Sequence, residues 1–173
     1  MDVFTAIKNR RSIRAYHSKP VPEEVLMRIL EAGRLAPSEG NIQPWHFVVV
    51  RDAKKREELS KGRLFAGFLR ESPVVIVGCG DQQASPRWHV VDVAIAMQNM
   101  VLTAKSEGLG TCWIGDFNEE KVKMLLKIPD KMKIIALLSL GFPRKKADLI
   151  GKLAKLIRRK KSLKEIVSFE EYE

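Results

Sequence analysis

The sequence has little of what marks a membrane, secreted or metal-binding protein. Its longest apolar runs, such as residues 74–80 and 134–138, are far shorter than the roughly 20 residues that span a bilayer. The first residues, MDVFTAIKNRRS, contain no apolar stretch followed by a cleavage site, so they do not resemble a signal peptide. We therefore expect a cytoplasmic protein with no membrane partner.

Cysteine and histidine are also scarce, with two and three residues respectively. Cys79 and Cys112 lie in apolar, strand-like segments, and neither has a second cysteine or a histidine at the spacing of metal ligands. We expect both thiols to be small buried groups in a reducing compartment. The sequence predicts no metal site.

Several motifs that identify common enzyme classes are absent. The glycines form neither the GxGxxG fingerprint of a dinucleotide-binding fold nor the GxxxxGKS loop that cradles nucleotide phosphates. No HExxH pair is present, and Ser38 lacks the glycine-flanked turn that exposes a hydrolase nucleophile. The sequence therefore shows no machinery for hydrolysis.

What the chain does contain is enough apolar material for a globular core. Its 173 residues are 45% hydrophobic and 30% charged, which predicts one domain over residues 1–173. The net charge of +10 is concentrated in residues 144–161, which hold nine basic residues and one aspartate. Because this segment has no interleaved aromatic residues, helix-turn-helix pattern or zinc-finger spacing, we do not expect it to bind nucleic acid.

Apolar periodicity predicts an alternation of helices and strands. We expect helices over 3–9, 22–36, 53–61, 88–107 and 118–128, and strands over 46–52, 73–80, 108–115 and 133–143. Such an order is typical of a three-layer α/β or α+β domain.

Three of these segments carry a further expectation. The apolar run 47–50 predicts a strand that is buried on both faces. Residues 88–107 are apolar almost all round, so this helix should be central to a core or lie in a subunit interface. Ile166, Val167 and Phe169 could form a last strand near the C-terminus.

The segment NRRSIRAY, residues 9–16, places Arg10, Arg11 and Arg14 within five positions. Mutual repulsion makes such a cluster costly unless water or an anion neutralises it. The cluster is therefore either a solvated basic turn or an anion site. A second basic cluster at residues 158–161 could converge with the first on one phosphate, where guanidinium groups give bidentate contacts.

Five segments, in order along nearly the whole chain, resemble the nitroreductase family of flavin enzymes. They are RRSIRAY (10–16), APSEGNIQPW (36–45), GLGTCWIGDF (108–117), LLSLGFP (137–143) and RRKKSLKEIV (158–167). The resemblance implies an α+β, three-layer α-β-α fold with a mainly antiparallel central sheet flanked by helices. It also implies a homodimer whose subunits embrace through the core helix and exchange their C-terminal tails.

The same resemblance implies a noncovalent FMN at the dimer interface and assigns residues to it. The residues so assigned are Arg10, Arg11, Ser12 and Arg14 at the phosphate, ribityl chain and pyrimidine edge; Pro37, Ser38 and Asn41, approaching from the partner subunit; Ile114, Gly115 and Asp116 near the flavin N5; and Arg158 and Lys160, closing on the phosphate.

For the reaction, the resemblance implies an FMN-dependent oxidoreductase. It would pass a hydride from NAD(P)H, through the flavin N5, to an electron-poor acceptor such as a nitroaromatic or a quinone in a ping-pong cycle. Because the flavin carries the redox chemistry, no catalytic side chain is assigned. Three alternatives stay open. The first is another reaction of the same flavin fold, either reductive dehalogenation or flavin fragmentation. The others are a non-enzymatic basic module that binds an anion and a flavin-binding protein that stores or senses FMN without turnover.

Overall fold

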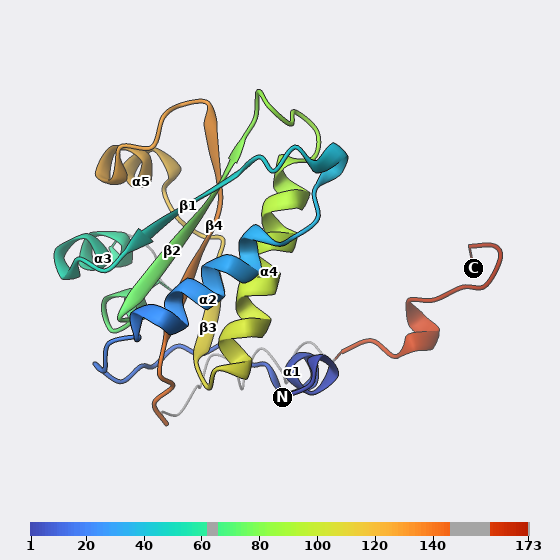
Figure 1. Ribbon diagram of the computed structural model, residues 1–173, viewed down its shortest axis with the longest axis horizontal. Helices are drawn as coiled ribbons and strands as arrows, with labels where there is room; N and C mark the ends of the chain where they lie inside the picture. The colour runs from blue at the N-terminus through green and yellow to red at the C-terminus, as the bar shows by residue number, and fades with distance from the viewer. Residues whose placement is uncertain (62–65, 146–159, 173) are drawn as a thin grey trace.

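The computed structural model describes residues 1–61, 66–145 and 160–172, and its elements follow the predicted order (Figure 1). The α-helices of this part of the chain are α1 (Val3–Asn9), α2 (Glu23–Arg34), α3 (Ala53–Ser60), α4 (His89–Ser106) and α5 (Glu119–Leu126). Its strands are β1 (Trp45–Val50), β2 (Val74–Asp81), β3 (Gly110–Ile114) and β4 (Met132–Gly141). Its short 3-10 helices are η1 (Glu39–Asn41), η2 (Gly67–Arg70) and η3 (Leu163–Glu165).

The described strands form one sheet in the order β1-β2-β4-β3, and every neighbouring pair is antiparallel. A bulge at Gly78 and Cys79 shifts the register between β2 and β4. Strand β3 stands at one end of this order, so its outer edge is available to another segment. There the N-terminal chain adds a single parallel bridge, between Ser12 and Thr111.

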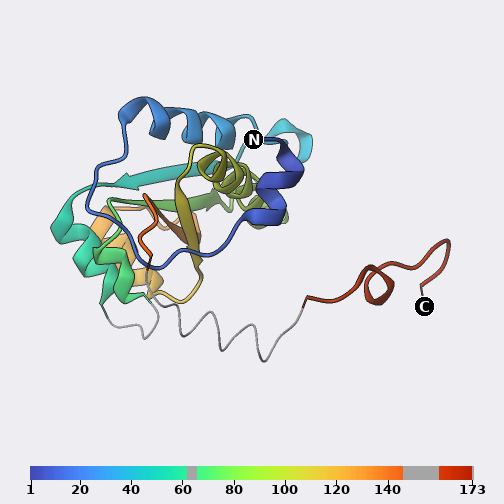
Figure 2. The ribbon, with the colours of Figure 1, turned by 90° about the horizontal axis from the view of Figure 1, so that it is seen from below.

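Helices cover both faces of the sheet, which gives three layers (Figure 2). Helices α2 and α4 pack on one face around a core that includes Ile76, Met97 and Leu138. Helices α3 and α5, with η2, lie over the other face around a second core that includes Val75 and Leu137. The alternation of side chains along β2 and β4 supplies both cores. The expected α+β, three-layer architecture is confirmed.

Helix α4 is the central helix, and glycines let its neighbours approach it closely. A Cβ at Gly33 of α2 would collide with Met100, and one at Gly78 of β2 would collide with Met97. The opposite side of α4 is different, because Val91 and Ile95 are 42% and 37% exposed. In the described ranges, no helix is long and apolar enough to cross a membrane.

Helix α1 ends where the arginine cluster begins. The Asp2 side chain accepts a hydrogen bond from Thr5 N at 2.9 Å and caps the helix, which extends to Asn9. Arg10 then adopts an extended conformation, with φ −61° and ψ 137°. This change of direction leads the following residues away from the helix and onto the sheet.

One expectation holds in part and another was wrong. The run 47–50 packs on both faces of the sheet, with Phe47 and Val49 against one core and Val48 and Val50 against the other, but only Val50 is fully buried because β1 is an edge strand. Among residues 160–172 there is no last strand: this segment forms η3, capped by a reciprocal pair between Ser162 and Glu165, and runs away from the body of the molecule (Figure 1). The apolar side chains that suggested a strand are exposed, and Phe169 is 84% exposed.

Candidate functional site

The arginine segment lies along the outer edge of β3. Ile13 N donates a hydrogen bond to Thr111 O at 2.9 Å, next to the bridge at Ser12. The close approach depends on Gly110, because a Cβ there would lie 2.5 Å from Ile13 Cγ1. Residues 10–14 are therefore held on the strand by a backbone bond and by the absence of a side chain opposite.

A buried tyrosine fixes the far end of the same segment. The Tyr16 hydroxyl is 2.6 Å from both Ile13 O and Ser139 Oγ, and Tyr16 is 3% exposed. Burial raises the pKa of this phenol well above its ordinary value, so the group stays protonated and can donate. The segment is thus held at Ser12 and Ile13 and again at Tyr16, which fixes the backbone on both sides of Arg14.

The arginines of this segment differ in their surroundings. Arg10 is half-buried, and its side chain has no hydrogen bond or ion pair within the described residues. Arg11 Nη1 donates to Lys8 O and to Arg10 O, each at 2.8 Å, which holds its guanidinium at the C-terminal end of α1. Arg14 is half-buried. Positive charges gathered in this way attract an anion.

The structure brings a second group of predicted residues to the same strand. Ile114 ends β3, and Gly115 and Asp116 follow it with exposed surfaces. A Cβ built on Gly115 would meet no atom within 4 Å, so a ligand could reach the backbone there. Because a strand rises by about 3.3 Å per residue, Thr111 and Ile114 are separated by about 10 Å. The edge therefore fits an elongated ligand whose anionic end lies at the arginines.

A third group lies elsewhere in this chain. Pro37, Ser38 and Asn41 lie beside the N-terminal end of α4, whereas α1 lies beside its C-terminal end (Figure 1). Helix α4 has 18 residues and is therefore about 27 Å long. A single chain does not bring this loop to the β3 edge.

The basic tail is also separate from the β3 edge. Lys160 is exposed at the start of the tail, which points away from the body in two perpendicular views (Figures 1 and 2). Arg158 lies outside the described residues.

The comparisons with known proteins identify the family. The model of the nitroreductase family matches residues 7–64 and 60–142. The chain belongs to the nitroreductase family. A relative from Methanothermobacter thermautotrophicus, provisionally named as an NADH dehydrogenase or NAD(P)H nitroreductase, is 38% identical over 149 residues, which cover 83% of this chain and 78% of the relative. The FMN reductase (NADPH) of Bacillus subtilis is 29% identical over 180 residues, an alignment that covers 90% of this chain and 70% of the relative.

Solved structures show the same family fold. The FMN-dependent nitroreductase from Clostridium difficile R20291 is 31% identical, with a TM-score of 0.80 over 98% of this chain and 99% of that one. A nitroreductase family protein from Clostridium novyi NT is 34% identical, with a TM-score of 0.79 over 84% of this chain and 87% of that one.

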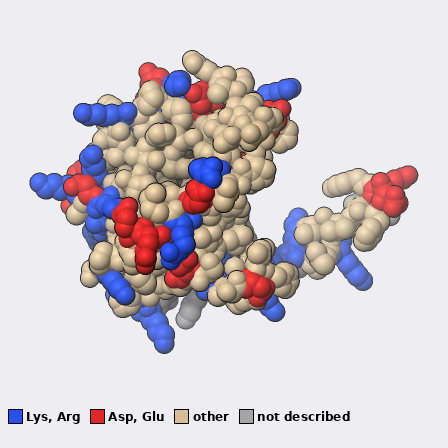
Figure 3. Space-filling view, viewed as in Figure 1, with Lys and Arg blue, Asp and Glu red and all other residues tan. Residues whose placement is uncertain are grey.

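This member of the nitroreductase family carries exposed apolar side chains on three of its elements. They belong to α1, α4 and the tail: Val3, Phe4, Ile7, Val90, Val91, Ile95, Leu163, Ile166, Val167 and Phe169. The surface over α4 has few charges on the side that faces the tail (Figure 3). Apolar surface of this kind favours contact with another protein surface over contact with water.

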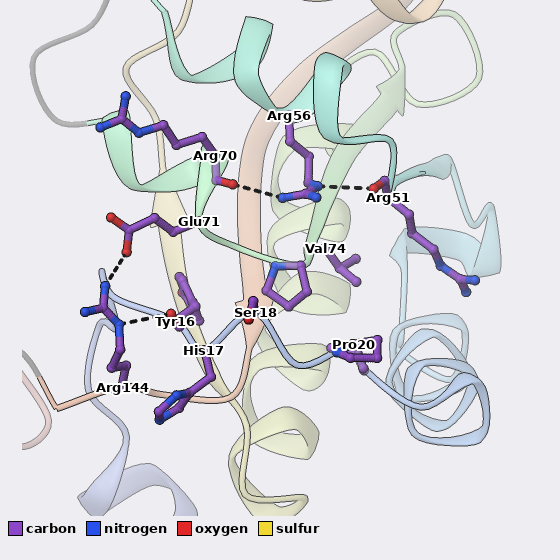
Figure 4. A pocket seen from close by; sticks show the side chains of 12 residues that line it. Tyr16, His17, Ser18, Pro20, Arg51, Arg56, Arg70, Glu71, Val74 and Arg144 are labelled. Atoms are coloured by element: carbon purple, nitrogen blue, oxygen red, sulfur yellow. Dashed lines mark hydrogen bonds and ion pairs between the residues drawn. The ribbon is translucent and has the colours of Figure 1, made fainter.

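A second arginine-rich feature is a pocket of about 680 Å³ near the ends of β1 and β2 (Figure 4). Two of its arginines, Arg56 and Arg144, bond to other segments of the chain. Arg56 donates to three carbonyl oxygens, at Arg51, Arg70 and Ser72, and desolvation lowers its pKa. Arg144 donates to Glu71 at 2.8 Å. These bonds hold separate segments of the chain together. The sequence did not predict this role, because the arginines are scattered along the chain.

Outside the arginine segment, the structure also shifts the pKa values of a cysteine and of an aspartate. Cys79 and Cys112 are buried, as expected, and burial raises the pKa of Cys79 to about 11, so this thiol is protonated at neutral pH. Asp81 accepts a hydrogen bond from Lys131 Nζ at 2.7 Å, which lowers the pKa of its carboxyl to about 2. Neither cysteine lies among the residues assigned to the β3 edge.

Two residues of structural interest escaped the sequence analysis. Gly110 lets the arginine segment approach β3 closely. Asp92 of α4 accepts a hydrogen bond from Glu39 N in the loop of residues 38–43. Asp92 is the only acidic residue of α4 (His89–Ser106). A single carboxylate in such an apolar helix could have indicated a special role from the sequence alone. Gly110 had no comparable signal, because its neighbour Ile13 is distant in sequence.

Proposed function

We propose that the protein is an FMN-dependent oxidoreductase that takes a hydride from NAD(P)H and passes it to an electron-poor acceptor such as a nitroaromatic or a quinone. The observation that carries the proposal is the single edge of β3, which presents Arg10–Arg14 at one end and residues 114–116 at the other. Relatives named FMN reductase (NADPH) and FMN-dependent nitroreductase support the choice of cofactor and of reductant.

The residues present fit FMN. Arg10 and Arg11 provide positive charge for a dianionic phosphate, and Ser12 adds a hydroxyl beside them. The open backbone at Gly115 allows a flat ring system to approach, because no side chain projects from that position. We assign Ile114, Gly115 and Asp116 to the flavin ring, with Arg14 between the two ends and Arg158 and Lys160 closing on the phosphate.

We further propose that the site is completed in a homodimer. The loop with Pro37, Ser38 and Asn41 lies at one end of α4, and the arginine segment lies toward the other. If two α4 helices pack antiparallel about a two-fold axis, the loop of each chain meets the arginine segment of the other. The exposed apolar residues of α1 and α4 would be buried in that contact, and the tail would reach across to the second subunit.

When bound, FMN supplies the hydride chemistry, which no side chain of the protein needs to provide. The task of the chain is to bind the phosphate, orient the ring and leave one face open to nicotinamide and then to the acceptor. One open face serves both substrates in turn, which predicts ping-pong kinetics.

The test is an absorption spectrum of the purified protein, recorded anaerobically before and after addition of NADH or NADPH. We expect bound FMN, identified by mass after release, and bleaching of its visible absorption by a nicotinamide. Parallel lines in a double-reciprocal analysis with a quinone would support the ping-pong cycle. A protein that stays colourless after incubation with FMN would contradict the proposal and favour the basic anion-binding module.

A further inference from the structure

Asp92 is a buried carboxylate with an unusual environment. It lies in the first turn of α4 and is 1% exposed. Its Oδ1 accepts a hydrogen bond from Glu39 N at 3.2 Å, whereas its Oδ2 is buried and has no hydrogen-bond partner within the described residues. Buried carboxylate oxygens are normally satisfied, so this residue calls for an explanation other than packing.

The segment that Asp92 contacts is a self-bonded loop of residues 38–43. Gln43 N donates to Ser38 Oγ at 2.9 Å, and Asn41 N donates to Ser38 O at 3.0 Å. Gly40, Asn41 and Gln43 all have φ between 53° and 57°, in the left-handed region. Such backbone is unfavourable for Gln43 in particular, so the loop needs external support to keep one shape.

That external support comes from α4. In the part of the chain that the structure describes, the bond from Glu39 N to Asp92 is the one hydrogen bond that ties residues 38–43 to another element. Between its covalent connections to Pro37 and Pro44, the loop is therefore attached to the body by one hydrogen bond, which Asp92 accepts. Its orientation on the body depends on Asp92.

We propose that Asp92 is a positioning residue that fixes the 38–43 loop in the orientation needed to present Ser38 and Asn41 to the FMN site of the second subunit. This inference rests on the function proposed above and deepens it. It accounts for a polar residue at this buried position: an apolar residue would avoid the cost of the unpaired Oδ2, but it would leave Glu39 N without an acceptor. The N-terminus of α4 favours a negative charge in its first turn and offsets part of the penalty.

The matched variants are Asp92→Leu and Asp92→Asn. Leucine has the same branched shape as aspartate, is larger and has no acceptor, whereas the asparagine oxygen can still accept from Glu39 N. We expect Asp92→Leu to weaken FMN binding about tenfold or more, the effect of one lost bond to a charged group, and Asp92→Asn to stay within about threefold of wild type. Amide hydrogen exchange of residues 38–43 should be faster in Asp92→Leu without FMN, while its denaturation midpoint is unchanged or higher.

Asp52→Ala is the control, because Asp52 also accepts a bond from a backbone amide, Lys55 N, at the start of the distant helix α3. It should lower the denaturation midpoint and leave FMN binding unchanged. If Asp92→Leu binds FMN as wild type does and its loop exchanges no faster, the inference is wrong. If wild-type protein binds no FMN, the proposed function fails, and the cofactor role of Asp92 fails with it. Amide hydrogen exchange would then still show whether Asp92 holds residues 38–43 in place.

Discussion

Replacement of Gly110 by alanine tests whether the arginine segment must lie against β3. The added Cβ would be 2.5 Å from Ile13 Cγ1, 2.8 Å from its Cβ and 3.1 Å from its Cγ2. Because Ile13 is β-branched, its side chain has little rotameric freedom, and the backbone of residues 10–14 must move instead. Overpacking of this kind costs about 1–3 kcal/mol. In a chain of this length, that corresponds to a fall in Tm of roughly 2–12 °C.

The assay is differential scanning calorimetry together with an FMN titration. We expect Gly110→Ala to show the lower Tm and to bind FMN at least about tenfold more weakly, since a displacement of the arginines separates them from the phosphate. Gly67→Ala is the matched control, because a Cβ at Gly67 would meet no atom within 4 Å. A Gly110→Ala protein with the Tm and FMN affinity of wild type would refute the reasoning, and a lower Tm with unchanged affinity would refute the link to the cofactor.

Three further predictions concern charge, assembly and acid stability. Arg10→Ala should weaken FMN binding at least about tenfold and leave the binding of riboflavin, which lacks the phosphate, unchanged, whereas Arg51→Ala should alter neither titration. Ile95→Glu should convert a dimer to monomers in sedimentation velocity, whereas Met124→Glu, 73% exposed on α5, should not. Because a hydrogen bond from its lysine partner lowers the pKa of Asp81 to about 2 from 3.8, the stability it contributes is complete above about pH 4 and is lost toward pH 2. The stability difference between wild type and Asp81→Asn should shrink over that range in chemical denaturation, and a constant difference would contradict the assignment.

The order of the elements could be predicted because local periodicity determines it. The apolar stretch 88–107 became α4, and the run 73–80 became the buried strand β2. The position of a strand within the sheet is not local information. The run 47–50 therefore gave no sign that β1 would be an edge strand, with only Val50 fully buried.

The candidate site was predictable only in part. The segments that carry the family resemblance placed Arg10–Arg14 and residues 114–116, and the structure brings these to one strand edge. Their contacts with FMN stay a prediction, as does the contribution of Ser38 and Asn41. The roles of Gly110 and Asp92 depend on contacts between segments far apart in the chain, which one sequence does not reveal.

A mixed-subunit experiment tests most directly the central claim that the FMN site is shared by two chains. One variant carries Arg10→Ala, and the other carries Ser38→Ala with Asn41→Ala; each alone should bind FMN poorly. After equal amounts are mixed and allowed to exchange subunits, each heterodimer should hold one intact site, so about a quarter of all sites should regain wild-type affinity. A mixture that forms heterodimers but regains no FMN binding would contradict the shared site.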